Sequence, residues 1–174
     1  MNVIIRKAEK DDMERIREIY NWAVLNSVAT FDLEERSIEQ NEHWFKEHQG
    51  RYPLYVAVTQ NRVIGWGSIS PFHPRAAYRP TGEFSIYIAP EYQGKKLGDR
   101  LLKHLCGCAE ALVYHSLIGL ITGTNVASLR LAEKNGFERV GHYREVGIKF
   151  GQWLDVIVVQ KMICNISGIS DNSF

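Results

Sequence analysis

The chain has 174 residues, which suits one domain that buries roughly 70% of the surface exposed by its unfolded form. Hydrophobic residues make up 45% and charged residues 24%, and the net charge of +1 offers no field to attract nucleic acid or an anionic membrane. No apolar run reaches the roughly 20 residues needed to span a bilayer, and three cysteines cannot make a disulfide framework. We therefore expect a cytoplasmic protein, with one domain over residues 1–163 and a frayed tail over residues 164–174.

The first 70 residues predict a short edge strand, two amphipathic helices and a β-hairpin. The first helix opens at Asp11-Asp12, and Ser37 with Gln40 forms the capping-box signature that opens the second. Two β-rich runs meet at Gln60-Asn61, a hairpin signal. The expected segments are 3–5, 11–23, 37–48, 54–59 and 62–70, and Trp22, Trp44 and Trp66 are expected in the core.

The rest of the chain alternates strands and helices after a proline-containing loop. We expect a strand that Pro90 stops and a long helix that begins at about Leu97. Cys106 and Cys108 are two apart in this helix and do not share a face, so no metal site is expected. The remaining segments are 117–122, 127–134, 138–146 and 153–162. The order predicts an α/β domain, with one mixed sheet flanked by helices.

A glycine-containing turn joins the strand that Pro90 stops to the long helix. The helix N-terminus offers unpaired N–H groups and the positive end of its dipole, both suited to phosphate. Gly94 and Gly98 let a ligand approach the backbone, and Lys95, Lys96 and Arg100 add positive charge. The alternative is an ordinary turn with solvated lysines. P-loop and dinucleotide-binding patterns are absent from the sequence.

This turn resembles the acetyl-CoA signature of the GNAT superfamily, Gln/Arg-x-x-Gly-x-Gly/Ala, with Lys96 standing at its central glycine. Residues 125–137 resemble the family's Asn-x-x-Ser-x-x-Leu…Gly-Phe segment. The resemblance implies the GNAT fold, a mostly antiparallel sheet and N-acetyltransferase activity with acetyl-CoA as co-substrate. The implied acetyl-CoA contacts are Ile86, Tyr87, Ile88, Gln93, Gly94, Lys95, Lys96, Leu97, Gly98, Asp99, Asn125 and Ser128.

Two further segments, 82–88 and 147–155, are similar to the phosphinothricin and methionine sulfoximine/sulfone acetyltransferase branch of that family. This likeness runs from about Ile4 to Met162. It implies a small amino-acid-like acceptor, a link to herbicide or antibiotic resistance, and a homodimer. Residues 149–153 are implied to complete the acceptor pocket.

The same resemblance implies Glu83 as the general base, which takes a proton from the acceptor amine directly or through water. The alternative for Glu83 is a salt bridge, for instance with Arg79. The amide of Ile88 is implied to hold the thioester oxygen. Ala132 stands where relatives have a histidine or tyrosine that protonates the leaving thiolate, so solvent or another group such as Tyr143 must serve.

The loop of residues 72–79 carries the arginines expected to bind an acceptor carboxylate or phosphinate. The candidate acceptor contacts are Phe31, Arg75, Ala77, Tyr78 and Arg79, with Glu83. A solvated loop is the alternative. Two other functions stay open: acetylation of a protein N-terminus, polyamine or aminoglycoside, and a catalytically silent CoA-binding module, which Ala132 and Lys96 would favour.

Overall fold

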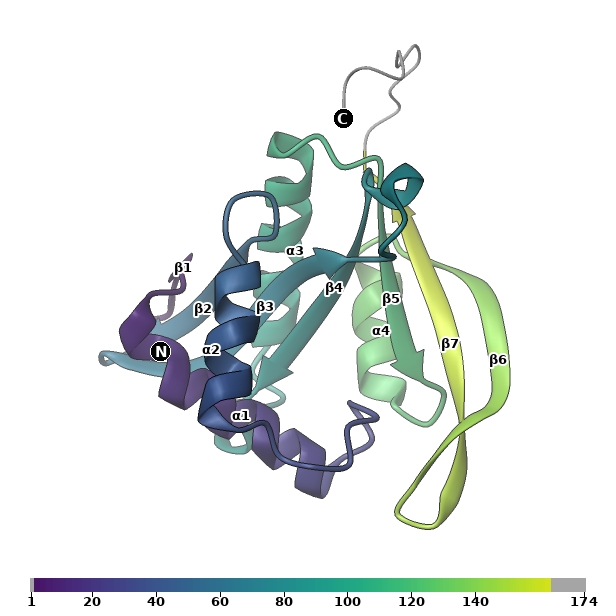
Figure 1. Cartoon of the computed structure of the whole chain (residues 1–174), viewed down its shortest axis with the longest axis horizontal. Helices are drawn as coiled ribbons and strands as arrows, with labels where there is room; N and C mark the ends of the chain where they lie inside the picture. Colours follow the sequence, from purple (N-terminus) through teal and green to yellow (C-terminus); the bar gives the residue numbers. More distant parts are fainter. Residues whose placement is uncertain (1, 164–174) are drawn as a thin grey trace.

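A computed structural model describes residues 2–163 and shows one seven-stranded sheet with helices on both faces (Figure 1). The strand order is β1-β2-β3-β4-β5-β7-β6. Every neighbouring pair is antiparallel except β4 and β5, which run parallel. The mixed, mostly antiparallel sheet predicted from the sequence is therefore confirmed. The tail expected over residues 164–174 lies outside the described residues.

The elements agree closely with the predicted segments. The strands are β1 (Ile4–Lys7), β2 (Leu54–Thr59), β3 (Arg62–Pro71), β4 (Thr81–Ile88), β5 (Ser116–Thr122), β6 (Glu138–Lys149) and β7 (Gln152–Met162). The helices are α1 (Met13–Asn26), α2 (Ile38–Glu47), α3 (Leu97–Ala111) and α4 (Val126–Lys134). Single turns of 3-10 helix are η1 (Lys10–Asp12), η2 (Ala76–Tyr78) and η3 (Pro90–Tyr92).

Local sequence signals account for several of these boundaries. Ser37 accepts a hydrogen bond from the backbone of Gln40, whose side chain accepts one from Ser37 in return, so the predicted capping box opens α2. Gln60 and Asn61 take φ values of 47° and 59°, as a tight two-residue hairpin turn requires. Trp22 was wrongly expected in the core: it is 38% exposed, because it points away from the buried side of α1.

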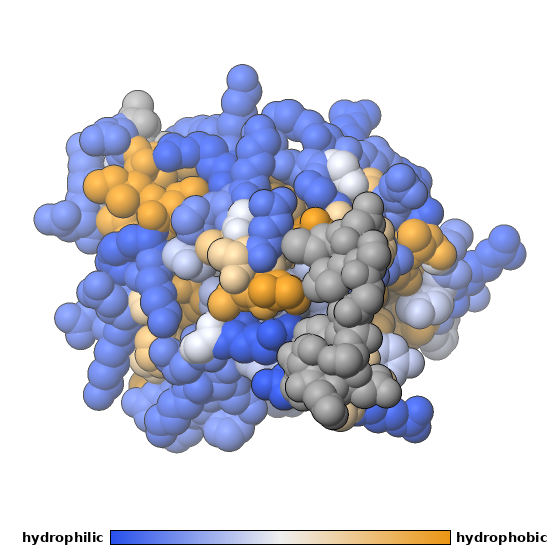
Figure 2. Space-filling view, turned by 90° about the horizontal axis from the view of Figure 1, so that it is seen from above, coloured by the Kyte–Doolittle hydropathy of each residue, from blue (hydrophilic) through white to orange (hydrophobic). Residues whose placement is uncertain are grey.

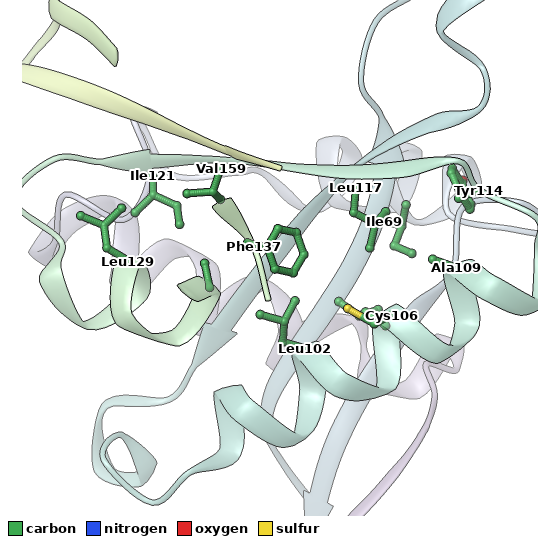
Figure 3. Close-up of a cluster of buried hydrophobic side chains, with 12 residues drawn as sticks. Ile69, Leu102, Cys106, Ala109, Tyr114, Leu117, Ile121, Leu129, Phe137 and Val159 are labelled. Atoms are coloured by element: carbon green, nitrogen blue, oxygen red, sulfur yellow. The ribbon is translucent and has the colours of Figure 1, made fainter. Parts of the chain in front are cut away.

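The core lies on both faces of the sheet. One cluster gathers side chains of α3, α4 and the sheet, with Leu102, Leu117 and Phe137 among its buried members (Figure 3). A second cluster packs α1 against β2 and β3, with Trp66 at its centre. Full burial of each such large apolar side chain contributes about 1.5–3 kcal/mol. The helices on the two faces therefore fix the sheet from both sides.

The parallel pair β4 and β5 separates after three residue pairs. Pairing runs from Thr81↔Ser116 to Glu83↔Ile118, and beyond it the strands diverge toward their C-terminal ends (Figure 1). The Phe84 ring lies against Gly119, where any Cβ would come within 2.5 Å of that ring. We call the divergent segments, residues 84–88 of β4 and 119–122 of β5, the fork.

The surface at the end where β4 and β5 begin is mostly hydrophilic, with hydrophobic residues in separate patches (Figure 2). Within residues 2–163, no helix combines the length and apolar character of a membrane span.

Candidate active site

Within residues 2–163, the fork leaves one edge of β4 without a strand partner from residue 84 onward. The amide of Ala89 donates to the carbonyl of Ile64, and in an antiparallel ladder such bonded residues alternate with unbonded ones. The backbone groups of Ile86 and Ile88 therefore point away from β3 and into the fork. The carbonyl of Ile88 is occupied, because the side-chain amide of Gln93 donates to it at 3.2 Å. The N–H groups of Ile86 and Ile88 have no acceptor on this side among the described residues and are therefore available to a ligand.

The turn before α3 presents a run of free backbone amides. From Gly94 to Asp99, none of these N–H groups has a hydrogen-bond acceptor within the described part of the chain. Gly94 and Lys96 take φ values of 72° and 61°, which bend the backbone around these groups. Six amides at a helix N-terminus form a cradle suited to phosphate oxygens. The predicted phosphate turn therefore has the donors that it needs.

The start of α4 lies at the same end of the fork. The side chain of Asn125 accepts from the amide of Ser128 at 3.2 Å and so caps the helix. Gly98 allows the close approach of α3 to Leu131, since a Cβ there would lie 3.0 Å from that side chain. The N-termini of α3 and α4 thus flank the open end of the fork (Figure 1).

The carboxylate of Asp99 ties the two helices together. It accepts from Asn135 and forms ion pairs with Lys103 and Lys134, each at 3.0–3.1 Å. The Asn135 hydrogen bond, followed by the two lysines, lowers the pKa of Asp99 to about 2. Only the backbone of Asp99 is therefore left to contact a ligand in the turn.

Glu83 occupies the closed end of the fork, in the last residue pair of β4 and β5. Burial raises the pKa of its carboxyl group above the ordinary value. Within residues 2–163, the Glu83 carboxyl has no ion pair and no hydrogen bond, so the salt bridge with Arg79 weighed from the sequence is not formed. A carboxyl group that is half-buried and unpaired has the character of a proton acceptor.

Position 132 and the alternative proton donor Tyr143 lie in different surroundings. Ala132 is 1% exposed and belongs to the core cluster beside α3, so its position offers no proton. Tyr143 lies on β6 with 53% of its surface exposed.

The loop of residues 27–36, after α1, is held across the open end of the fork. Side chains from four separate elements bond to it, and no local sequence pattern indicates these contacts, because three of the four partners lie 58 to 119 positions away. The bonds run from Thr122 to the Val28 carbonyl, from Tyr87 to the Ala29 carbonyl, from Lys149 to the Thr30 carbonyl, and from Tyr20 to the Asp32 carboxylate. Lys149 is only 4% exposed, which makes it a structural anchor of this loop.

Phe31 packs against β6 rather than standing free in the loop. A Cβ on Gly147 would lie 2.3 Å from the Phe31 ring, so only glycine leaves room for this contact. The sequence singled out both residues but did not pair them.

The arginine loop, residues 72–80, lies at the other end of β4. Tyr78 packs on Phe72 and His73, at ring distances of 5.7 and 4.6 Å. The exposed candidates here are Arg75, Ala77, Tyr78 and Arg79. Seven strand residues at about 3.3 Å each separate this loop from the part of β4 that Tyr87 bonds to the 27–36 loop. Within one chain, Phe31 and the arginines therefore do not meet.

Comparison with known proteins gives matches over nearly the whole chain. Residues 5–158 match a family model described as an acetyltransferase (GNAT) domain. The chain is 35% identical to the L-methionine sulfoximine/L-methionine sulfone acetyltransferase of Salmonella typhimurium, over 90% of this chain and 92% of that protein. It is 34% identical to the phosphinothricin N-acetyltransferase of Streptomyces coelicolor, over 88% and 92% of the two chains.

A solved structure with a similar fold carries a ligand. It is a phosphinothricin acetyltransferase from Sinorhizobium meliloti in complex with AcCoA, with a TM-score of 0.94 and 35% identity. The superposition covers 99% of this chain and 95% of the other. The matched region includes the fork, the amide turn and the start of α4.

Proposed function

The chain belongs to the GNAT acetyltransferase family and uses acetyl-CoA as its donor, and from this premise we propose that it acetylates the amino group of a small amino-acid-like acceptor. The observation that carries the proposal is the fork, where free amides line one strand edge and an unpaired carboxyl group stands at the closed end. Relatives at 34–35% identity are named for methionine sulfoximine, methionine sulfone and phosphinothricin, which share an α-amino acid framework.

The donor site that we propose combines the amide turn with the free edge of β4. Acetyl-CoA supplies an activated acetyl thioester, and its phosphates suit the six amides of residues 94–99. Gln93, Asn125 and Ser128 complete this end. The backbone at Ile86, Tyr87 and Ile88 would pair with the extended pantetheine arm as a neighbouring strand does.

Glu83 is the proposed general base. An α-amino group has an ordinary pKa of about 7.7–8.0 and must lose a proton before it can attack a carbonyl carbon. In this step an N–H bond of the acceptor breaks and an O–H bond forms on Glu83. The N–H of Ile88, directed into the fork, would donate to the carbonyl oxygen on which negative charge grows.

The acceptor site that we propose uses the arginine loop and Phe31. Arg75 and Arg79 are exposed and form no ion pair within the described residues, so their guanidinium groups are free to bind a carboxylate or phosphinate bidentately. Ala77, Tyr78 and Phe31 would contact the rest of the acceptor. Because Phe31 and the arginine loop lie at opposite ends of β4, one acceptor touching both requires a second chain or movement of a loop.

A homodimer is the proposed assembly. The β6–β7 hairpin exposes large apolar side chains that are between 51% and 63% accessible, an unusual concentration for a solvated surface. They are Val140, Tyr143, Val146, Ile148, Phe150 and Trp153. A second copy covering this hairpin would bury them beside Lys149 and Phe31. We further propose that residues 1–163 act as one domain in the cytoplasm, which the single sheet and the free thiols of Cys106 and Cys108 support.

The substrate proposal is tested by thiol release from acetyl-CoA over a panel of amines. The panel contains methionine sulfone, methionine sulfoximine, phosphinothricin, standard amino acids, spermidine, an aminoglycoside and a peptide with a free N-terminus. We expect turnover on the first three. Turnover confined to the last three would overturn the acceptor class and leave the donor site intact. Tight acetyl-CoA binding with no turnover on any amine would favour the silent binding module.

The role of Glu83 is tested by Glu83→Gln, which keeps the shape of the side chain and removes its basicity. We expect kcat to fall by about 10²–10⁴-fold while the Kd for acetyl-CoA stays unchanged. Glu42→Gln, an exposed change on α2, is the matched control and should keep full turnover. A Glu83→Gln enzyme within twofold of wild type would show that the base is another group.

A further inference from the structure

A buried histidine and a serine stand next to Glu83 on the face of the sheet that α1 and α2 cover. His48, directly after α2, is 3% exposed. Its Nε2 lies 2.9 Å from the Oγ of Ser70, and its Nδ1 lies 2.7 Å from the carbonyl oxygen of Trp44. The His48 ring packs on the Trp44 ring at 4.2 Å, which fixes its orientation. Neither residue belongs to the donor or acceptor site described above.

The partners of His48 determine where the hydrogens lie. A carbonyl oxygen only accepts hydrogen bonds, so Nδ1 must carry the hydrogen that Trp44 receives. Burial lowers the pKa of His48 below its ordinary value; Arg36 acts in the same direction, while the Trp44 carbonyl and Glu47 oppose it. The ring is therefore neutral near pH 7, and Nε2 has only a lone pair. Consequently, the hydroxyl of Ser70 donates its single hydrogen to Nε2.

The sheet places Ser70 directly opposite Glu83. The two residues are register partners on β3 and β4 and point to the same face. The bonding alternation set by Ala89 and Ile64 makes them a hydrogen-bonded pair, with Cα atoms about 5.5 Å apart. Since the hydrogen of Ser70 is committed to His48, the oxygen of Ser70 offers only lone pairs to the Glu83 carboxyl.

We propose that His48 and Ser70 are positioning residues for Glu83: by holding the Ser70 hydrogen, His48 makes Ser70 an acceptor for the protonated carboxyl group. Within residues 2–163, no hydrogen bond joins Ser70 to the Glu83 carboxyl, and with its hydrogen on His48 the serine has none to give an ionised carboxylate. When Glu83 takes a proton from the amine, its side chain turns toward Ser70, and the new O–H group donates to the Ser70 oxygen. The proton stays on Glu83, and no charge enters the buried ring of His48.

The arrangement favours the protonated state of Glu83 without any nearby charge. Burial raises the pKa of the Glu83 carboxyl, and within residues 2–163 no charged side chain forms an ion pair with it. The catalytic value of the arrangement rests on the proposed function, because it matters for turnover only if Glu83 is the base. Its effect on the proton affinity of Glu83 is independent of activity.

The experiment is a pH titration of the protein labelled with ¹³C in the glutamate carboxyl groups. The Glu83 signal is identified as the one missing from Glu83→Gln. His48→Phe keeps an aromatic ring against Trp44 and releases the Ser70 hydroxyl, which can then donate to the Glu83 carboxylate. We expect the proton affinity of Glu83 to fall by about tenfold in His48→Phe. It should fall less in Ser70→Ala, and Ser70→Thr should restore the wild-type midpoint.

Other results of the titration would contradict the role of His48 and Ser70 or the role of Glu83. If His48 merely completes the hydrogen bonding at the end of α2, the Glu83 midpoint will stay unchanged in every variant, and the inference is wrong. The exposed Glu42 is an internal control and should keep its midpoint throughout. Should His48→Phe fail to fold, the comparison of Ser70→Ala with Ser70→Thr decides. A shifted Glu83 midpoint together with an active Glu83→Gln enzyme would support the effect of His48 and Ser70 on Glu83 and would reject Glu83 as the base.

Discussion

Lys96 adopts a backbone conformation that side chains other than glycine rarely take. Its φ and ψ angles are 61° and 16°, in the left-handed region, immediately before α3. This explains why the family signature has glycine at the position, since an L-residue there costs roughly 1–2 kcal/mol. The backbone N–H of Lys96 is still one of the six amides of the turn without an acceptor in the described part of the chain. Lysine in place of glycine therefore adds backbone strain and charge but keeps this hydrogen-bond donor.

Lys96→Gly should stabilise the protein by about 0.5–1 kcal/mol, the relief of strain less the extra freedom gained by the unfolded chain. Urea unfolding without acetyl-CoA measures the difference. Lys96→Ala is the control, because it removes the same charge and keeps the strained conformation. Equal stability of the two variants would mean that the turn stores no strain at this residue.

Residues differ in how far the sequence alone could assign them. Gln93, Gly98 and Asn125 stand in contiguous patterns whose helix-start chemistry is local, so their positions were predictable. The bond between His48 and Ser70 spans 22 positions and that between Lys149 and Thr30 spans 119, and no local pattern reports such contacts. The sequence also could not show that Glu83 lacks an ion pair, because this depends on where Arg79 points.

At the scale of elements, the sequence predicted the helices and strands but not the fork. Periodicity and turn residues act over a few positions, and these fixed the boundaries to within one to three residues. At the point where β4 and β5 part, the Phe84 ring lies against Gly119, a contact between residues that are far apart in the chain. The placement of α3 beside α4 also depends on a tertiary contact, the bonds of Asp99 with Asn135 and Lys134.

Asp99→Asn should lower the thermal stability of the ligand-free protein in a pH-dependent way. The pKa of Asp99 is lowered to about 2 by Asn135, Lys103 and Lys134, whereas an unfolded aspartate has about 3.9. The carboxylate therefore contributes stability above about pH 4, and loses it as the pH falls toward 2. The difference in Tm between wild type and Asp99→Asn should shrink over this range.

Calorimetric scans between pH 2 and pH 7 make this measurement. Asp11→Asn is the matched control, because Asp11 is exposed and forms no ion pair within residues 2–163. A Tm difference for Asp99→Asn that stays constant across the range would show that the ion pairs of Asp99 with Lys103 and Lys134 add nothing to stability.

At the scale of the whole molecule, the β6–β7 hairpin predicts self-association. Ile148 and Trp153 are register partners on the two strands and are 51% and 63% exposed. Sedimentation equilibrium should give a dimer for the wild-type chain and a monomer for the double variant Ile148→Ser/Trp153→Ser. Trp22→Ser, at an exposed tryptophan on α1, should remain dimeric. A monomeric wild-type chain would exclude this assembly and leave the acceptor site to one chain.

Because β4 and β5 diverge after Glu83, the sheet of the ligand-free protein has a gap between these two strands. The amide hydrogens of Ile86 and Ile88 have no strand partner on the side of the fork within residues 2–163, so they should exchange with deuterium rapidly in the absence of a ligand, although they belong to a central strand. Bound acetyl-CoA should slow their exchange and raise the melting temperature with concentration. Slower exchange at these two residues would mean that the donor molecule takes the place of a strand, so that the metabolite consumed by the protein contributes to the stability of its fold.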